Sequence, residues 1–278
     1  MSGFSPEWLA LREPADHQAR DANLEQRMAA HFAACTHVSV VDLGCGSGSN
    51  LRGTAKFLPD HQSWRLVDYD AQLLALARHR LVEWADESRT EGTLLRLRKD
   101  HKHVNVSFVE ADLTRELAQM LTPAPDLVTA AALFDLVSEP WLELFTAALG
   151  AAGLPLYTVL SYDGRQEWQP PHQQDGRVLR AFNGHQQWDK GFGPATGPRA
   201  AAVLSGLLEA RGYAVHTAGS PWLLGPDDPD LRHELATGIA AAAVETQELT
   251  PEEADGWLAA RREPGQAMIG HTDIFATP

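Results

Sequence analysis

Hydrophobic and polar positions along the chain follow two periodicities, which predict helices and strands in regular succession. Apolar residues recur at helical spacing over residues 7–34, and Pro14 interrupts them, which predicts two helices there. Beyond residue 36, short apolar runs alternate with helical patterns, and this alternation indicates a parallel sheet with helices on both faces. The predicted strands are 37–43, 64–68, 104–109, 126–131 and 154–162, and the predicted helices are 49–57, 71–84, 114–121 and 139–149. The polar stretch 86–103 follows neither pattern.

Two irregular segments, 163–197 and 220–264, interrupt this alternation in the second half of the chain. The first contains one predicted helix, over 176–188, and the second contains two. A helix over 199–211 and strands over 213–218 and 268–275 restore the order. The sequence therefore predicts an N-terminal helical cap, 1–35, followed by one domain, 36–278, that carries two insertions.

The first predicted strand ends in an acid and a run of glycines. Asp42 is followed by Gly44, Gly46 and Gly48, after which a helix begins. Glycines at such spacing let a backbone bend sharply and let a ligand approach it. The dinucleotide fingerprint Gly-x-Gly-x-x-Gly requires a glycine at position 49, where Ser49 stands. This offset favours S-adenosylmethionine over NAD as the ligand.

The next three strands also end in residues that suit parts of one ligand. Asp68 lies about 20 residues beyond the glycines, where an acid accepts hydrogen bonds from ribose hydroxyls. Asp112 follows the third strand and suits the amine of an adenine, and Asp135 follows the fourth, near the reactive end. Taken singly, Asp68 also fits a solvated strand end, and Asp112 also fits a cap for the helix at Thr114.

Together these segments resemble the class I S-adenosylmethionine-dependent methyltransferases. The matching stretches are 41–48, 66–70, 109–113 and 126–129; the resemblance is strong over 36–162 and weaker over 213–218 and 269–275. It implies an α/β, Rossmann-like, seven-stranded sheet whose last strand is antiparallel. It also implies methyl transfer from S-adenosylmethionine, with S-adenosylhomocysteine as product. The candidate cofactor-binding residues are Asp42, Gly44, Gly46, Ser47, Asp68, Tyr69, Asp112, Leu113 and Ala131.

The segment 11–16, together with Arg20, resembles the N-terminal part of bacterial small-molecule methyltransferases of this class. In those enzymes such a segment covers the cofactor. Arg12 or Arg20 would then pair with the cofactor carboxylate. A surface helix is the alternative for both arginines.

The two insertions leave the predicted sheet at its carboxyl edge and are rich in aromatic residues, as small-molecule pockets are. They are expected to form a helical lid over the substrate; the alternative is a satellite core with buried tryptophans. Histidine titrates near neutrality, and the pKa of a carboxylate can be shifted by its surroundings, so either group suits a general base. The candidate catalytic residues are His185, Tyr162, Asp163 and Asp135, with the first three expected to line the acceptor site. The candidate substrate-binding residues are Arg165, Trp168, Trp188 and Lys190.

Composition limits the kinds of partner, compartment and metal that are expected. The 278 residues carry a formal net charge of -14, which argues against nucleic acid as a partner. Only Cys35 and Cys45 occur, the first residues lack the layout of a signal peptide, and no apolar run is long enough for a bilayer, so a cytoplasmic protein is expected. No metal is expected, because His101 and His103 lack obvious partners.

Two other functions remain open. An NAD(P)-dependent oxidoreductase would use the same kind of sheet, although Ser49 and the lack of a hydride-transfer constellation count against it. A non-catalytic S-adenosylmethionine-binding protein would also keep the sheet. Such a protein would be marked by altered glycines or by the loss of Asp68, and the sequence has neither change. The acceptor, its methylated atom and the oligomeric state are not defined by the sequence.

Overall fold

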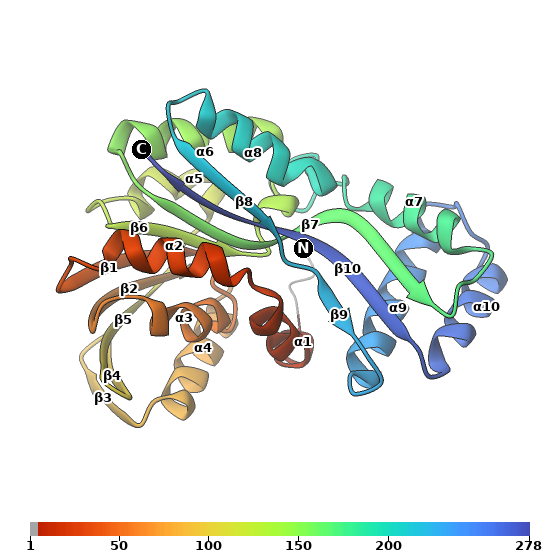
Figure 1. Ribbon diagram of the computed structural model, residues 1–278, viewed down its shortest axis with the longest axis horizontal. Coiled ribbons are helices and arrows are strands. Elements are labelled where there is room, and N and C mark those ends of the chain that lie inside the picture. Colours follow the sequence, from red (N-terminus) through yellow and green to blue (C-terminus); the bar gives the residue numbers. More distant parts are fainter. Residues whose placement is uncertain (1–4) are drawn as a thin grey trace.

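One mixed sheet forms the centre of the protein. The computed structural model describes residues 5–278, so residues 1–4 of the expected cap lie outside it. Ten strands follow the order β3-β4-β5-β2-β1-β6-β7-β10-β8, with β9 paired to β10 (Figure 1). The strands are β1 His37–Leu43, β2 His61–Asp68, β3 Glu87–Glu91, β4 Leu94–Lys99, β5 Lys102–Glu110, β6 Leu127–Ala131, β7 Leu156–Gln169, β8 Ala214–Gly219, β9 Trp222–Leu224 and β10 Gln266–Thr277.

The helices cover both faces of this sheet. They are α1 Pro6–Ala19, α2 Ala22–Phe32, α3 Ser49–Thr54, α4 Ala71–Trp84, α5 Leu113–Met120, α6 Glu139–Ala152, α7 Asp175–His185, α8 Ala200–Glu209, α9 Pro229–Glu245 and α10 Pro251–Arg262, with 3-10 turns η1 Ala55–Phe57, η2 Phe134–Leu136 and η3 Gly197–Arg199. Apolar residues of α5, α6 and α8 share a core on one face, and those of α2, α3 and α4 share a core on the other. None of the helices within residues 5–278 is long and apolar enough to cross a membrane.

The strand count corrects the expected seven. The strands β5, β2, β1, β6 and β7 are parallel, and β10 runs antiparallel between β7 and β8, as the resemblance implies. Three strands come in addition: β3 and β4 form a hairpin on β5, and β9 pairs with β10. Almost all of β3 is exposed, and in β4 only Leu95 and Leu97 are buried. The hairpin therefore lacks the strong apolar pattern that reveals a core strand.

The prediction of a helix break at Pro14 is also wrong. Helix α1 continues through Pro14 to Ala19, and the chain turns at Arg20. Asp21 then caps α2, because its Oδ1 accepts a hydrogen bond of 2.9 Å from the Leu24 N–H. Contacts along both sides of α1, described below, hold it against the rest of the protein despite the missing N–H of the proline.

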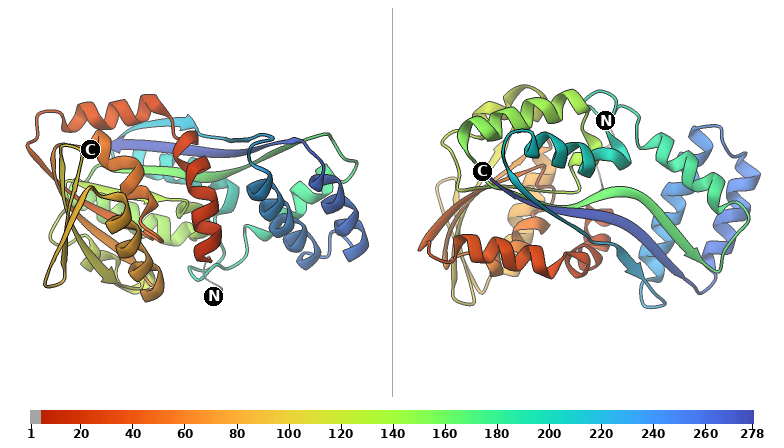
Figure 2. Two further views of the ribbon diagram at one scale, coloured as in Figure 1. Left: turned by 90° about the horizontal axis from the view of Figure 1, so that it is seen from below. Right: turned by 45° about the horizontal axis from the view of Figure 1, so that its top comes forward.

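A long two-stranded ribbon carries the insertions. β7 and β10 pair from Leu156 and Ala276 as far as Gln169 and Gln266, well past the end predicted at residue 162. Helices α7, α9 and α10 pack beside this extension, beyond the main sheet (Figure 2). Side chains from both insertions and from the ribbon form one buried core that includes Val178, Trp222, Ile239, Trp257 and Ile269.

Candidate cofactor and acceptor site

The loop between β1 and α3 takes a conformation that needs glycine. Gly44, Gly46 and Gly48 have φ of +64°, +52° and +75°, in the left-handed region that other residues rarely adopt. A Cβ on Gly44 would also lie only 3.1 Å from Leu133. The turn brings the backbone N–H groups of this loop to the carboxyl end of β1, where an open α/β sheet binds its ligands.

Asp68 joins the end of β2 to this loop. Its Oδ2 accepts a hydrogen bond of 2.8 Å from the Gly46 N–H, and its Oδ1 accepts one of 3.1 Å from the Asp70 N–H. Burial raises the pKa of the Asp68 carboxyl, although these backbone N–H groups oppose the shift. Each carboxylate oxygen has a further lone pair, so Asp68 is able to accept hydrogen bonds from two hydroxyls as well. Tyr69, the next residue, is exposed.

Asp42 lies beneath the loop. Its Oδ1 accepts a 2.7 Å hydrogen bond from the Asn50 amide, which also donates to the Thr129 hydroxyl at 3.0 Å. Its Oδ2 is buried without a partner, and burial raises the pKa of the carboxyl to about 7. Asn50 therefore ties the start of α3 to Asp42 of β1 and to Thr129 of β6, and these contacts hold the loop from below.

Asp112, the acid after the third predicted strand, caps helix α5, which is the structural alternative to a role in binding adenine. Asp112 Oδ1 accepts hydrogen bonds from the Thr114 N–H at 2.9 Å and from the Thr114 hydroxyl at 2.6 Å, which lower the pKa of Asp112. Leu113 is buried, and its carbonyl accepts a hydrogen bond from the Trp141 indole. Ala131 ends β6 at the same edge of the sheet.

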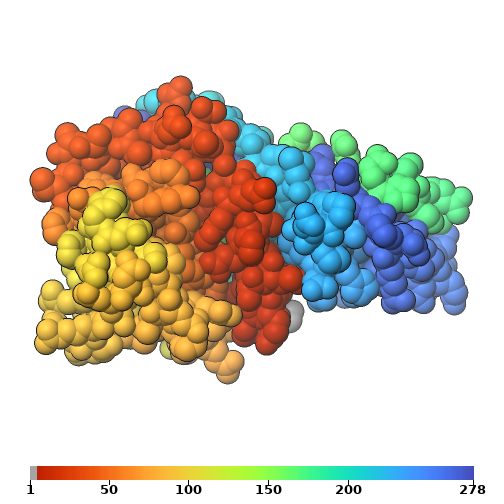
Figure 3. Space-filling model, turned by 60° about the horizontal axis from the view of Figure 1, so that its bottom comes forward, coloured from red at the N-terminus to blue at the C-terminus, as the bar shows by residue number. Residues whose placement is uncertain are grey.

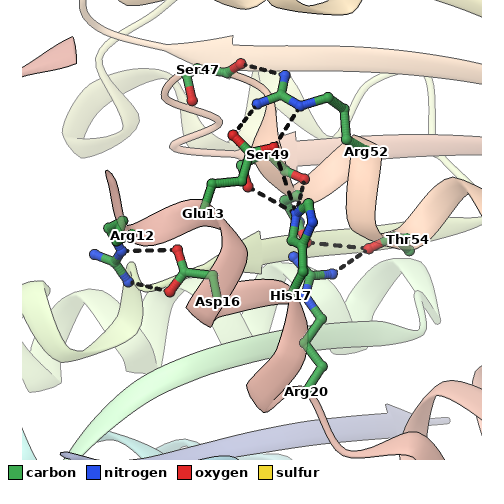
Figure 4. A network of polar contacts seen from close by, with 10 residues as sticks. Arg12, Glu13, Asp16, His17, Arg20, Ser47, Ser49, Arg52 and Thr54 are labelled. Atoms are coloured by element: carbon green, nitrogen blue, oxygen red, sulfur yellow. Dashed lines mark hydrogen bonds and ion pairs between the residues drawn. The ribbon is translucent and has the colours of Figure 1, made fainter. Parts of the chain in front are cut away.

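Helix α1 covers the glycine loop (Figure 4). The Glu13 carboxylate accepts two hydrogen bonds from Arg52, of 2.7 and 2.6 Å, and Arg52 donates another, of 2.9 Å, to the Ser47 carbonyl. His17 Nε2 lies 3.0 Å from the Ser49 carbonyl oxygen. Figure 3 shows α1 on the surface, between the α4 side of the sheet and α9.

Neither arginine of the N-terminal segment lies on an open surface. Arg20 is buried and donates to the Thr54 hydroxyl at 2.9 Å. Arg12 forms two hydrogen bonds with Asp16, of 2.9 and 3.1 Å, and lies over the Trp222 ring at 5.0 Å. The Trp222 indole also donates to Asp16, at 3.1 Å. One side of α1 thus contacts the loop, and another contacts β9.

The candidate catalytic residues do not form one cluster. Tyr162 is buried and donates to the Asn183 amide oxygen at 2.8 Å, whereas Asp163 accepts from Arg165 at 2.5 Å. His185 Nε2 lies 3.0 Å from a Glu245 carboxylate oxygen, on α9. Asp135, in η2, is buried with no partner on its Oδ1, and burial raises its pKa to about 6.

The candidate substrate-binding residues are spread over the insertions. Trp168 is buried and packs edge-to-face on Trp257, with 5.4 Å between ring centroids. Trp188 is exposed and lies beside His185, and the Lys190 Nζ is 3.4 Å from His185 Nδ1. The side chain of Arg165 is largely exposed and paired with Asp163.

Sequence reasoning missed His271. It lies on β10, opposite Tyr162 in the strand pairing, and it is buried with no partner on Nδ1. Burial lowers the pKa of its imidazole to about 3, so the ring is neutral. The available signal was a histidine in the middle of a mainly apolar strand, two residues before another polar residue, Asp273. Within residues 5–278, no group of three or more histidine, cysteine or acidic side chains is arranged to hold a metal.

Comparison with known proteins identifies the fold. No protein-family model and no curated protein matches the sequence. Among solved structures, the cyclopropane synthase MmaA2 from Mycobacterium tuberculosis matches with a TM-score of 0.52 and 12% identity, over 99% of this chain and 95% of that chain. A cyclopropane-fatty-acyl-phospholipid synthase-like protein from Lactobacillus casei ATCC 334 matches with 0.51 and 17%, over 96% and 99%, and YcgJ from Bacillus subtilis with 0.51 and 11%, over 92% and 98%. The chain therefore has the Rossmann-like methyltransferase fold that the sequence predicts.

Proposed function

We propose that this protein transfers a methyl group from S-adenosylmethionine to a small-molecule acceptor. The observation that carries the proposal is the hydrogen bond between buried Asp68 and the Gly46 N–H, which joins the acid at the end of β2 to the glycine loop after β1. An acid at this place accepts hydrogen bonds from ribose hydroxyls, and the left-handed glycines leave backbone N–H groups beside it. The shared fold supports the same assignment.

The residues at the strand ends fit the parts of this cofactor. The loop from Gly44 to Ser47 holds the methionine part, with Asp42 bracing it from below. Asp68 accepts from the ribose hydroxyls beside Tyr69, whereas Asp112 and Leu113 contact the adenine, and Ala131 lies near the sulfur. When bound, the cofactor supplies an activated methyl group. The protein then has to align the acceptor in line with it and exclude water.

The acceptor is assigned to the carboxyl ends of β6 and β7, under a lid made by the insertions 163–197 and 220–264. The position of the insertions, which follow β7 and β8 in the chain and lie next to Tyr162, supports this. Their buried tryptophans also form the core that was the alternative to a lid. Tyr162 and Asp135 lie nearest the strand ends, whereas His185 and Asp163 act from the lid. The side chains that would contact the acceptor from the lid are Arg165, Trp188 and Lys190, whereas Trp168 belongs to the buried core of the insertions.

Isothermal titration tests the cofactor. The purified protein should bind S-adenosylhomocysteine and not NAD. Asp68→Ala should weaken that binding about 10- to 100-fold, because hydrogen bonds to a charged group are lost. Asp60→Ala, an exposed acid at the other edge of the sheet, should bind as the wild type does. Tight binding of NAD alone would favour the oxidoreductase.

A second set of variants tests the acceptor residues. Tyr162→Phe, Asp163→Ala and His185→Ala should each reduce turnover of an acceptor and leave the dissociation constant for S-adenosylhomocysteine within about twofold, since none of them contacts the glycine loop. If cofactor binding falls with turnover, these residues are structural. Binding of S-adenosylhomocysteine with no turnover of any acceptor would favour a non-catalytic binding protein.

We place this activity in the cytoplasm, with a small molecule rather than nucleic acid as partner. Cys35 and Cys45 are both free thiols, which fits a reducing compartment. The formal net charge of -14 opposes a phosphate backbone.

A further inference from the structure

Two buried polar atoms at the carboxyl edge of the sheet have no hydrogen-bond partner. They are Oδ1 of Asp135, a residue 7% exposed, and Nδ1 of His271, a residue 5% exposed. Buried polar atoms nearly always have a partner in a folded protein, so an exception calls for an explanation. A ligand that supplies the missing hydrogen bonds is one such explanation.

Both side chains lie next to Tyr162. The backbone N–H of Tyr162 approaches the Asp135 carboxyl and lowers its pKa. His271 faces Tyr162 across the β7–β10 pairing, with 6.3 Å between the ring centroids. The Arg12 guanidinium of α1 lowers the pKa of both Asp135 and His271. The two unpartnered atoms thus belong to one site, where β6, β7 and β10 meet α1.

One buried acid near this site, Asp273, is fully paired. Asp273 lies two residues beyond His271 on β10, and it is also buried. Its Oδ1 accepts from the Leu160 N–H at 2.8 Å and from the Ser220 hydroxyl at 2.5 Å, and its Oδ2 accepts from the Asp21 N–H at 3.0 Å. The fold therefore supplies partners to a buried carboxylate on this strand, and Asp135 and His271 differ from that pattern.

We propose that Asp135 and His271 together bind the methyl acceptor, and that the accepting atom is an oxygen or nitrogen that carries a proton, as in a hydroxyl compound or an amine. This inference rests on the proposed function. The acceptor lone pair forms the bond to the methyl carbon, the carbon–sulfur bond of the donor breaks with its electron pair left on sulfur, and the acceptor proton passes to Asp135. His271, which is uncharged, forms one hydrogen bond that orients the acceptor.

Matched leucine variants test whether the two residues serve a ligand. Leucine has nearly the shape of aspartate, and it removes the unpartnered Oδ1 of Asp135. Asp135→Leu and His271→Leu should therefore keep or raise the melting temperature in calorimetry, and their affinity for S-adenosylhomocysteine should stay within about twofold of wild type. Asp273→Leu, the control, should lower the melting temperature by about 5 °C or more, because it strands three donors.

A fall in melting temperature for Asp135→Leu and His271→Leu as large as that of Asp273→Leu would make both residues structural and overturn the proposal. Failure of the wild type to bind S-adenosylhomocysteine would instead overturn the proposed function. The melting temperatures would still decide whether Asp135 and His271 form a ligand site.

The acceptor chemistry has a direct probe. In protein with ¹⁵N-labelled histidine and bound S-adenosylhomocysteine, phenol and benzylamine should shift the His271 Nδ1 resonance, and toluene should not. The shift should disappear in Asp135→Leu if the two residues hold one ligand. Equal shifts from toluene, or no shift from phenol and benzylamine, would overturn the assigned class of acceptor.

Discussion

Burial gives Asp42, Glu25 and Asp135 raised pKa values, about 7 for the first two and about 6 for the third. Each therefore keeps a proton in the folded protein at pH values where the unfolded chain has released it. Because these three carboxyls then bind more protons in the native state, their contribution to the free energy of unfolding falls as pH rises from about 4 towards 7. These three carboxyls therefore favour the folded state most in mild acid, whereas the burial of neutral His271 acts in the opposite direction.

Replacing Asp42 should weaken this pH dependence. In Asp42→Asn, the slope of the unfolding free energy between about pH 4 and 7 should become less negative by up to about 1.4 kcal/mol per pH unit, since one titrating proton is removed. Urea unfolding at several pH values measures the slope. Asp60→Asn is the control, because the Lys102 ammonium holds the pKa of Asp60 below this window. An unchanged slope in Asp42→Asn would show that Asp42 does not titrate there.

At the scale of elements, α1 connects two parts of the site. Glu13 and His17 contact Arg52 and Ser49, next to the glycine loop, whereas Asp16 contacts Trp222 of β9. A helix held on both sides covers the loop firmly while those contacts last. Its own core is small, since Ala15 is its only apolar residue classed as fully buried, so polar contacts decide how often it opens.

Breaking the contacts on the loop side should loosen α1. Arg52→Ala removes the hydrogen bonds to Glu13 and to the Ser47 carbonyl, and α1 amides should exchange with deuterium about 10-fold faster. S-adenosylhomocysteine should also dissociate faster. Arg96→Ala, an exposed position on β4, serves as control. Faster exchange spread over the whole sheet would indicate global destabilisation and count against a separate opening of α1.

Local signals predicted the parts of the fold that depend on local sequence. Helix α4 begins at Ala71 and ends at Trp84 as predicted, because Asp70 caps it and its apolar spacing is regular. The end of β7 was placed seven residues too early, since its continuation depends on pairing with β10, about 100 residues away. The hairpin β3–β4 was not predicted, because most of its side chains face solvent and give no apolar pattern.

The same division holds for the site. The glycines and Asp68 are recognisable from spacing, and the structure brings them within hydrogen-bonding distance. His271 is not recognisable, because an unpartnered nitrogen depends on which side chains other strands bring near it. Likewise, no local signal separated His185 from Tyr162, which have different partners in the folded chain.

Across the whole molecule, the insertions depend on each other for their core. Trp257 of α10 is fully buried, packs on Trp168 of the ribbon and donates to Asp175 of α7 at 2.8 Å. Neither insertion supplies this set of contacts alone. A substitution that disrupts the core in one insertion should therefore destabilise both insertions.

Trp257→Ala should lower the free energy of unfolding by about 3 to 5 kcal/mol, because it leaves a large cavity. Binding of S-adenosylhomocysteine should survive below the melting temperature, since the glycine loop is not touched. Trp188→Ala, at an exposed position, should change stability by less than about 1 kcal/mol. Calorimetry and titration measure the two effects, and equal losses in both variants would contradict a shared core.

The position of β10 between β7 and β8 has a consequence for the order of folding. Asp273 of β10 binds the N–H of Asp21, 252 residues earlier, at the turn between α1 and α2. Contacts so distant in sequence close large loops and form late. The helices over the glycine loop thus dock on a surface that the last strand completes. Elements that join late and rest on few apolar contacts also detach at low free-energy cost. A cofactor bound as proposed would then be able to enter by detachment of α1 alone, with the ten-stranded sheet left intact.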